Sequence, residues 1–245
     1  MSGPDRGRRS FWLVLLRHGE STWNSRNLFT GWVNVPLSPV GEQEAMRAGR
    51  LLAASDLRPA FVHTSLQRRA IQTADLALAE CDRDWIPVRR SWRLNSNHYG
   101  ALQGRDKDQV RAEYGDGQYQ AWRRQYRCAP PPLPDDAPYS QFADPRYAVI
   151  PAEARPRTES LREVSARLLP YWYDAIVPDL LTGWCVLVVS HGNTLRALIK
   201  HLDLVDDEAS SRLEVPTGRP VAYELDHDMR PVVPGGRDLL PGTAQ

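Results

Sequence analysis

Apolar residues fall along the chain in two patterns that predict different elements. Unbroken apolar runs at Phe11–Leu16 and Cys185–Val189 predict strands that are buried on both faces. Shorter runs at Phe61–His63 and Val221–Leu225 predict two further strands. Both of the longer runs are followed directly by polar residues, so the sequence changes from apolar to polar where each strand ends.

Other segments repeat their apolar residues every three or four positions, which predicts helices. One helix starts at Ser38-Pro39, a capping residue followed by a first-turn proline, and runs to Ala54. The others are expected at 66–78, at 161–176 with a kink at Pro170, and at 193–202.

The alternation of strands and helices predicts an α/β fold with a mostly parallel central sheet flanked by helices on both faces. We expect one domain over residues 11–230, a flexible tail over 1–10 and a C-terminal tail over 231–245. Residues 125–157 are rich in proline and lack periodic apolar positions. A long irregular segment in a compact domain is typically a functional lid or a disordered loop, and we predict a lid here.

Composition narrows the classes of partner. A net charge of +1 over 245 residues gives no strong field for nucleic acid or for an anionic membrane. No segment approaches the roughly 20 apolar residues that span a bilayer. The three cysteines are scattered without a CxxC pair, which favours a reducing, cytoplasmic location. We therefore expect no nucleic-acid partner and no membrane partner.

Candidate chemistry lies where the two long apolar runs end. Arg17-His18 follows the first run and His191 follows the second, and each histidine precedes a glycine. In a parallel sheet the carboxyl ends of strands meet at one edge, where ligands bind. A single such histidine is readily a hydrogen-bonded core residue, but two matched endings favour a site. Arg69, after the strand at 61–63, would lie at the same edge.

The residue types point to phosphate chemistry rather than to a metal. The chain has no HExxH, G-x-S-x-G or GxxxxGK[ST] motif, so we expect no bound metal. Imidazole is a capable nucleophile toward phosphorus, and the planar guanidinium of arginine pairs with phosphoryl oxygens. Two histidines and two arginines at one sheet edge therefore predict an anion pocket.

Several longer stretches resemble one known family. They include "LLRHGESTWNSRNLFTGW", "TSLQRRAIQTA", "HYGALQG", "HGNTLRALIKHL" and "PTGRPVAYELD". From Phe11 to Asp226, in order, the chain resembles the cofactor-dependent phosphoglycerate mutase family of the histidine phosphatase superfamily. The resemblance implies a cytoplasmic isomerase of glycolysis and gluconeogenesis that interconverts 2- and 3-phosphoglycerate. It also implies a small phosphorylated substrate and a homo-oligomer, since family members are often dimers or tetramers.

The resemblance assigns a role to each candidate residue. His18 would accept the phosphoryl group as a phosphohistidine, His191 would stabilise the group in transfer, and Arg17 and Arg69 would clamp its oxygens. The phosphate and substrate pocket would be lined by Ser21, Asn24, Thr30, Gly31, Gly192 and Asn193. The substrate's second anionic group would be bound by Tyr99, Lys107, Arg123 and Arg124. No permanent cofactor is implied, and 2,3-bisphosphoglycerate would be the phosphoryl primer of a true mutase.

One short stretch departs from the family pattern. The family has Leu-Asn-Glu-Arg-His-Tyr-Gly, with the glutamate as general acid–base and the arginine as a substrate contact. This chain has Ser96 and Asn97 at those two positions. A serine hydroxyl exchanges protons poorly near neutral pH, and a positioned acid–base group contributes about 10²–10⁴-fold to rate.

Three interpretations stay open at this point. The first is a phosphoglycerate mutase that is weakened, or supported by another acid such as Glu20 or Asp106. The second is a mutase or phosphatase for a different phosphorylated metabolite. The third, from another class, is an inactive protein that binds phosphometabolites. The retained nucleophile favours the first two interpretations, because a binding module needs none.

Overall fold

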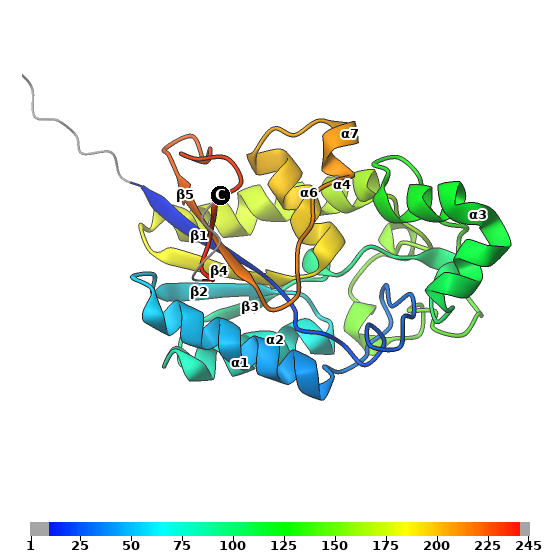
Figure 1. Cartoon of the computed structure of the whole chain (residues 1–245), viewed down its shortest axis with the longest axis horizontal. Coiled ribbons are helices and arrows are strands. Elements are labelled where there is room, and N and C mark those ends of the chain that lie inside the picture. Colours follow the sequence, from blue (N-terminus) through cyan, green and yellow to red (C-terminus); the bar gives the residue numbers. More distant parts are fainter. Residues whose placement is uncertain (1–9, 241–245) are drawn as a thin grey trace, which may run out of the picture.

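The computed structural model describes residues 10–240, and its centre is a six-stranded sheet with helices on both faces (Figure 1). The strand order is β3-β2-β4-β1-β5-β6. The strands are β1 (Phe11–Arg17), β2 (Pro59–Thr64), β3 (Val88–Arg90), β4 (Cys185–Ser190), β5 (Pro220–Leu225) and β6 (Arg237–Asp238). The four strands from β3 to β1 are parallel, whereas β5 and β6 are added antiparallel.

Helices cover both faces of the sheet, and α3 (Lys107–Arg124) lies away from it at one end of the molecule (Figure 1). The other α-helices are α1 (Pro39–Ala54), α2 (Arg68–Glu80), α4 (Leu161–Tyr171), α5 (Val177–Leu181), α6 (Gly192–Leu202) and α7 (Asp207–Ser210). Figure 1 shows α1 and α2 on one face of the sheet and α4 and α6 on the other. Within residues 10–240 no helix is both long enough and apolar enough to cross a membrane.

Strand β1 shows why both faces are covered. Leu13 and Leu15 belong to the core shared with α4 and α6, whereas Val14 and Leu16 belong to the core shared with α1 and α2. Side chains alternate between the two faces of a strand, so an unbroken apolar run requires a helix layer on each side. The predicted α/β class with helices on both faces is confirmed.

Most predicted elements occur close to their expected bounds. Ser38 caps α1, its Oγ accepting the amide of Gly41 at 3.1 Å, and α1 ends at Ala54 as expected. Helix α2 begins at Arg68, two residues after the expected start. The expected kink at Pro170 takes the form of a π-helical turn, η5 (Trp172–Ile176), between α4 and α5.

Several elements have weak sequence patterns and were missed, among them β3 and α3. Strand β3 has three residues, too few for a visible alternation. Helix α3 is polar and has Gly115 in its middle with φ of 80°, so two helical pieces meet at a kink there. A glycine at positive φ interrupts the apolar periodicity by which a helix is recognised.

The two expected tails have different outcomes. Residues 1–9 of the predicted N-terminal tail lie outside the described residues. The predicted C-terminal tail over 231–245 is corrected in part, because β6 at Arg237–Asp238 pairs with Val221 and Ala222 of β5. Two residues are too short a strand to predict from a local pattern, so the sheet extends further along the chain than expected.

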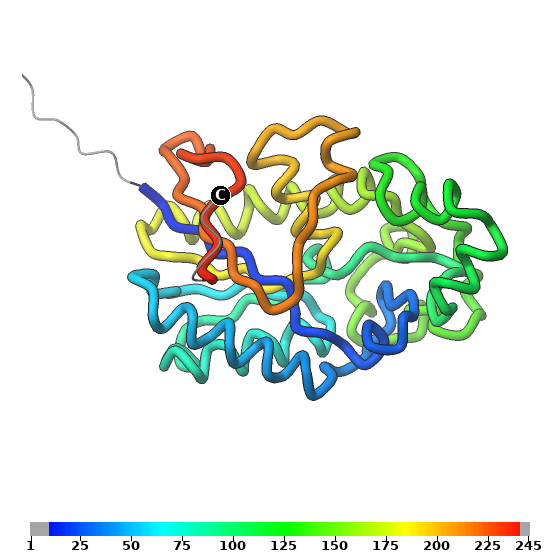
Figure 2. Tube along the Cα trace, in the orientation of Figure 1, coloured from blue at the N-terminus to red at the C-terminus, as the bar shows by residue number. Residues whose placement is uncertain are grey.

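The proline-rich segment 125–157 has only short 3-10 turns, η3 (Pro145–Tyr147) and η4 (Ala152–Ala154). Two more 3-10 turns, η1 (Trp92–Leu94) and η2 (Gly100–Leu102), flank the neighbouring loop. Figure 2 shows the segment at the same end of the molecule as α3 and the loop that follows β1. Leu133, Tyr147 and Ile150 are buried within it, so in this structure it is packed rather than loose.

Candidate active site

The two histidines meet because β1 and β4 are adjacent and parallel. Arg17 pairs with Ser190 in the register of the two strands, and the amide of His18 donates to Ser190 O at 2.9 Å. His191 follows Ser190 directly, so the two imidazole rings lie with their centroids 4.9 Å apart. Both side chains are buried, and both line one pocket at the carboxyl edge of the sheet.

Glycine after His18 is required by a close contact with α1. A Cβ on Gly19 would lie 2.1 Å from the carbonyl oxygen of Gly41, and a Cβ on Gly41 would lie 1.9 Å from Glu20 O. Neither distance is compatible with a side chain. The loop that carries His18 therefore packs backbone against backbone on the first turn of α1, which holds the imidazole in place.

His18 presents one nitrogen that is free for chemistry. Nδ1 lies 2.6 Å from Gly19 O, and a carbonyl oxygen only accepts, so Nδ1 carries the proton. The lone pair is then on Nε2, which receives a long 3.3 Å hydrogen bond from Nε of Arg69. Burial, followed by Arg69 and Arg17, lowers the pKa of His18 well below 6.5. The imidazole is neutral near pH 7 and can attack an electrophile through Nε2.

His191 has the complementary arrangement. Its Nε2 lies 2.9 Å from Ser65 Oγ, and that hydroxyl also accepts the amide of Gln67 at 3.2 Å. The Ser65 hydroxyl can then donate its own proton to Nε2 of His191. This favours the tautomer of His191 whose ring proton is on Nδ1. Burial, followed by Arg69 and His18, lowers the pKa of His191 well below 6.5. Nδ1 is buried and has no partner within residues 10–240, so a donor is left for a bound anion.

Two arginines lie near the histidines in the pocket. Arg69 is almost fully buried and donates to Gly31 O at 2.9 Å and to Val33 O at 3.0 Å. Its pKa falls to about 9 because of burial, which still leaves the guanidinium charged near pH 7. Arg17 donates to Val215 O at 2.7 Å, and its buried Nε has no partner in the described chain. Both cations are oriented by backbone carbonyls rather than neutralised by carboxylates.

A second group of cations lines the same pocket. It consists of Lys107, Arg123, Arg124 and Arg196. Arg124 is paired with Glu214 at 2.7 Å, and Arg123 donates to Tyr119 Oη at 3.0 Å. So many cations in one pocket suit a small molecule that carries more than one anionic group.

The loop that carries Ser96 and Asn97 is held from behind by a buried ion pair. Arg167 bonds Glu159 at 2.6 Å and also donates to the carbonyl oxygen of Ser96 at 2.9 Å. Ser96 lines the pocket, and no hydrogen bond of its hydroxyl occurs within residues 10–240. Asn97 is buried and accepts a hydrogen bond from Nδ2 of Asn193. These contacts hold the backbone of the loop, so its two unusual side chains have defined positions at the pocket.

The pocket contains all but one of the predicted site residues. Ser21 is the exception: it is fully buried and shares hydrogen bonds with Asn24, which does line the pocket. The residues that lie together are Arg17, His18, Asn24, Thr30, Gly31, Arg69, Ser96, Asn97, Tyr99, Lys107, Arg123, Arg124, His191, Gly192 and Asn193. Their individual roles stay predictions.

Other lining residues were not anticipated. They are Leu28, Arg196, Leu213, Glu214 and Val215. Arg196 could have been found, since it lies in the first turns of the helix after His191. Residues 213–215 belong to an irregular segment with no pattern of their own, so only the folded chain brings them to the pocket.

Two candidate acids and the proline-rich segment do not line the pocket. Glu20 accepts a hydrogen bond from Ser38 Oγ at 2.6 Å, and Asp106 caps α3 by accepting from two backbone amides. Neither carboxylate lines the pocket, so neither lies where a substitute acid is needed. Residues 125–157 contribute no lining residue either, and closure of this segment as a lid remains a prediction.

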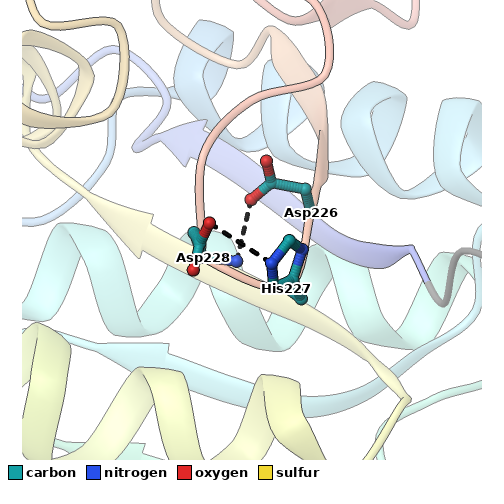
Figure 3. Close-up of side chains that lie close together, drawn as sticks. All are labelled: Asp226, His227 and Asp228. Atoms are coloured by element: carbon teal, nitrogen blue, oxygen red, sulfur yellow. Dashed lines mark hydrogen bonds and ion pairs between the residues drawn. The ribbon is translucent and has the colours of Figure 1, made fainter.

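One cluster of potential metal ligands lies elsewhere. Asp226, His227 and Asp228 come together in the turn after β5, as Figure 3 shows. A carboxylate oxygen of Asp226 accepts the amides of Asp228 and Arg230, each at 2.9 Å, which is the geometry of a tight turn. Since His227 and Asp228 are exposed and the cluster is separate from the pocket, these contacts explain the turn and assign no metal.

Comparison with known proteins agrees with this architecture. The model of the Histidine phosphatase superfamily (branch 1) matches residues 13–144 and 135–233. Among solved structures, a mycobacterial glucosyl-3-phosphoglycerate phosphatase is 25% identical with a TM-score of 0.69, covering 90% of this chain and 95% of the other. The chain therefore belongs to the histidine phosphatase superfamily.

The curated relatives define the family within that superfamily. A 2,3-bisphosphoglycerate-dependent phosphoglycerate mutase of Streptomyces griseus is 61% identical over 95% of this chain and 92% of its own. The enzyme of that name from Thermobifida fusca is 60% identical over 95% and 94% of the two chains. The chain belongs to this phosphoglycerate mutase family, and it is an enzyme of the mutase-like phosphotransfer type.

Proposed function

We propose that this enzyme interconverts 2- and 3-phosphoglycerate through a phosphohistidine on His18. The observation that carries the proposal is a set of buried donors without partners in the described chain: Nδ1 of His191, Nε of Arg17, Nε of Arg196 and Oγ1 of Thr30. All four residues line the pocket. Buried polar groups in proteins are nearly always hydrogen-bonded, so a cluster of unpartnered donors suits a polyanionic ligand.

The two histidines with Arg17 and Arg69 supply the phosphoryl-transfer chemistry. Nε2 of His18 attacks phosphorus, and the leaving oxygen departs on the opposite side. Arg17 and Arg69 stabilise the negative charge on the three equatorial oxygens, and Nδ1–H of His191 donates to one of them. Preorganised donors of this kind are strongest in a pocket shielded from water.

The other arginines of the pocket hold the rest of the substrate. Arg123, Arg124 and Arg196 would bind the carboxylate and the second phosphate while the first phosphate meets His18. The same cations also fit 2,3-bisphosphoglycerate, whose chemical contribution is the phosphoryl group that primes His18. Residues of this chain orient the ligand so that either hydroxyl oxygen can face Nε2.

The test is an assay of 3-phosphoglycerate with and without 2,3-bisphosphoglycerate, followed by phosphorus NMR. We expect 2-phosphoglycerate to form, and to form faster with the primer. Release of inorganic phosphate without isomerisation would instead support a phosphatase. That second candidate is favoured by the structural similarity to a phosphatase and by the loss of a cation at Asn97. Absence of both products would support a protein that only binds phosphometabolites.

A further inference from the structure

The proposed reaction requires a group that exchanges protons inside the pocket. When phosphorus moves from an alkyl oxygen to Nε2 of His18, the oxygen leaves as an alkoxide and must gain a proton. In the reverse direction an attacking hydroxyl must lose one. An alkoxide is strongly basic, so the proton has to come from a side chain at the pocket.

Most polar side chains of the pocket are unsuited to this exchange. The arginines stay protonated. His191 is neutral near pH 7, so it can donate a hydrogen bond but has no spare proton to transfer. Glu214 is paired with Arg124, and 70% of its side chain is exposed at the rim. Ser96 offers only a hydroxyl.

Lys107 differs from each of these groups. It lines the pocket, it is partly buried, and its ammonium forms no hydrogen bond or ion pair with any residue of 10–240. Of the 31 lysine and arginine residues in the chain only two are lysines, Lys107 and Lys200. The pocket therefore contains an amine, which can lose its proton, in a chain whose cations are otherwise almost all guanidinium groups.

The surroundings of Lys107 favour loss of that proton. Burial lowers the pKa of Lys107 to about 8, with Arg123 and Arg17 acting in the same direction and Asp106 and Asp108 opposing them. Lys107 is also the first residue of α3, where the helix dipole disfavours a positive charge. A group that titrates near the working pH can both donate and accept a proton.

We propose that Lys107 is the general acid–base of this enzyme, a role that rests on the proposed phosphotransfer through His18. In one direction the P–O bond breaks as the Nε2–P bond forms, and the Lys107 ammonium gives its proton to the departing alkoxide. In the other direction the neutral amine takes the proton of the attacking hydroxyl as the new P–O bond forms. Atoms and charges balance without any further reactant.

The experiment compares two phosphoryl donors in single-turnover labelling of His18. With 2,3-bisphosphoglycerate the leaving group is an alkoxide that needs a proton. With p-nitrophenyl phosphate it is a phenolate that leaves unprotonated. In Lys107→Arg, which keeps the charge, we expect labelling by the alkyl donor to fall about 100-fold and labelling by the aryl donor to fall less than about fivefold.

A pH profile and a control variant complete the test. Labelling of the unmodified enzyme by the alkyl donor should decline above about pH 8, as Lys107 loses its proton, and labelling by the aryl donor should show no matching step. Lys200→Arg should change neither rate, since Lys200 bonds Val205 O and Asp207 outside the pocket. Equal losses with both donors in Lys107→Arg would overturn the role of Lys107 and leave the proposed function standing. No labelling of the unmodified enzyme by either donor would overturn the proposed function and this inference together.

Discussion

His18 and His63 are both buried histidines of the same sheet, yet their surroundings are opposite. Both ring nitrogens of His63 have partners, Tyr171 Oη and a carboxylate oxygen of Asp179, each at 3.0 Å. Asp179 is also bound by Arg89 at 2.7 Å. His18 has arginines and no carboxylate around it, and its Nε2 faces a pocket.

The difference shows what separates a structural histidine from a reactive one. Burial lowers the pKa of both rings, so neither a buried position nor a lowered pKa identifies the nucleophile. The distinguishing features are a ring nitrogen without a strong hydrogen-bond partner and neighbouring cations that are not paired with a carboxylate. His63 has neither, and its network is complete in itself.

The largest effect is expected from removing the nucleophile. His18→Ala should reduce phosphohistidine labelling by at least about 10³-fold, because it removes the proposed nucleophile. Acid-labile labelling with a phosphodonor measures this change. His63→Gln is the matched control and should label normally. Retained labelling in His18→Ala would show that the nucleophile is misassigned.

The next effect concerns the neighbouring ring. His191→Ala should slow labelling about 10²–10³-fold, since it removes one preorganised donor to the phosphoryl oxygens. Binding of inorganic phosphate, measured by calorimetry, should weaken by less than about tenfold. His191→Gln, which keeps a donor, should recover part of the rate. A loss of phosphate binding as large as the loss of rate would mean that His191 mainly binds phosphate in the ground state and does not stabilise the transition state further.

The third effect falls on stability rather than on chemistry. His63→Gln should lower the free energy of unfolding at pH 7.5 by roughly 1–3 kcal/mol, because Asp179 and Tyr171 lose a buried partner. Denaturant titration at several pH values checks this value.

The same variant tests the titration of His63. Burial lowers the pKa of His63 to about 4, below the value of 6.5 that an unfolded histidine has. As the pH falls from about 6.5 to 4, the unfolded chain gains a proton that the folded ring resists, so stability is lost. The gap between the unmodified protein and His63→Gln should therefore shrink over this range. A constant gap would indicate that the ring is charged in its pair with Asp179.

The smallest effect is expected at the unusual loop. Ser96→Glu should raise the rate of 2-phosphoglycerate formation by up to about tenfold, by adding a carboxyl group at the pocket. Asn97→Arg should mainly lower KM, because it adds charge rather than proton transfer. The double variant should exceed both single variants. No gain in the double variant would mean that the pocket suits a substrate other than phosphoglycerate.

Much of the fold could be predicted because its patterns are local. The apolar runs of β1 and β4 are buried on both faces, and Ser38-Pro39 marks the start of α1, so each feature can be recognised from neighbouring residues. Helix α3 could not, because Gly115 divides it and most of its side chains are polar. Its stability comes from tertiary packing of Val110, Tyr119 and Trp122, which no local pattern reveals.

The candidate site divides in the same way. His18 and His191 could be paired from the sequence because parallel strands place their carboxyl ends together. The family resemblance supplied most of the other residues that line the pocket. Glu214 and Val215 could not be foreseen, because they reach the pocket through contacts with Arg124 and Arg17 that depend on the whole fold.

The backbone contact between Gly19 and Gly41 limits where this enzyme can vary. Because neither position can accept a side chain, substitutions there would displace α1 and the reactive imidazole together. Ser96, Asn97 and Glu214 also line the pocket, and these positions already carry side chains. A library built to change the substrate should therefore randomise these three positions and leave the glycine contact intact.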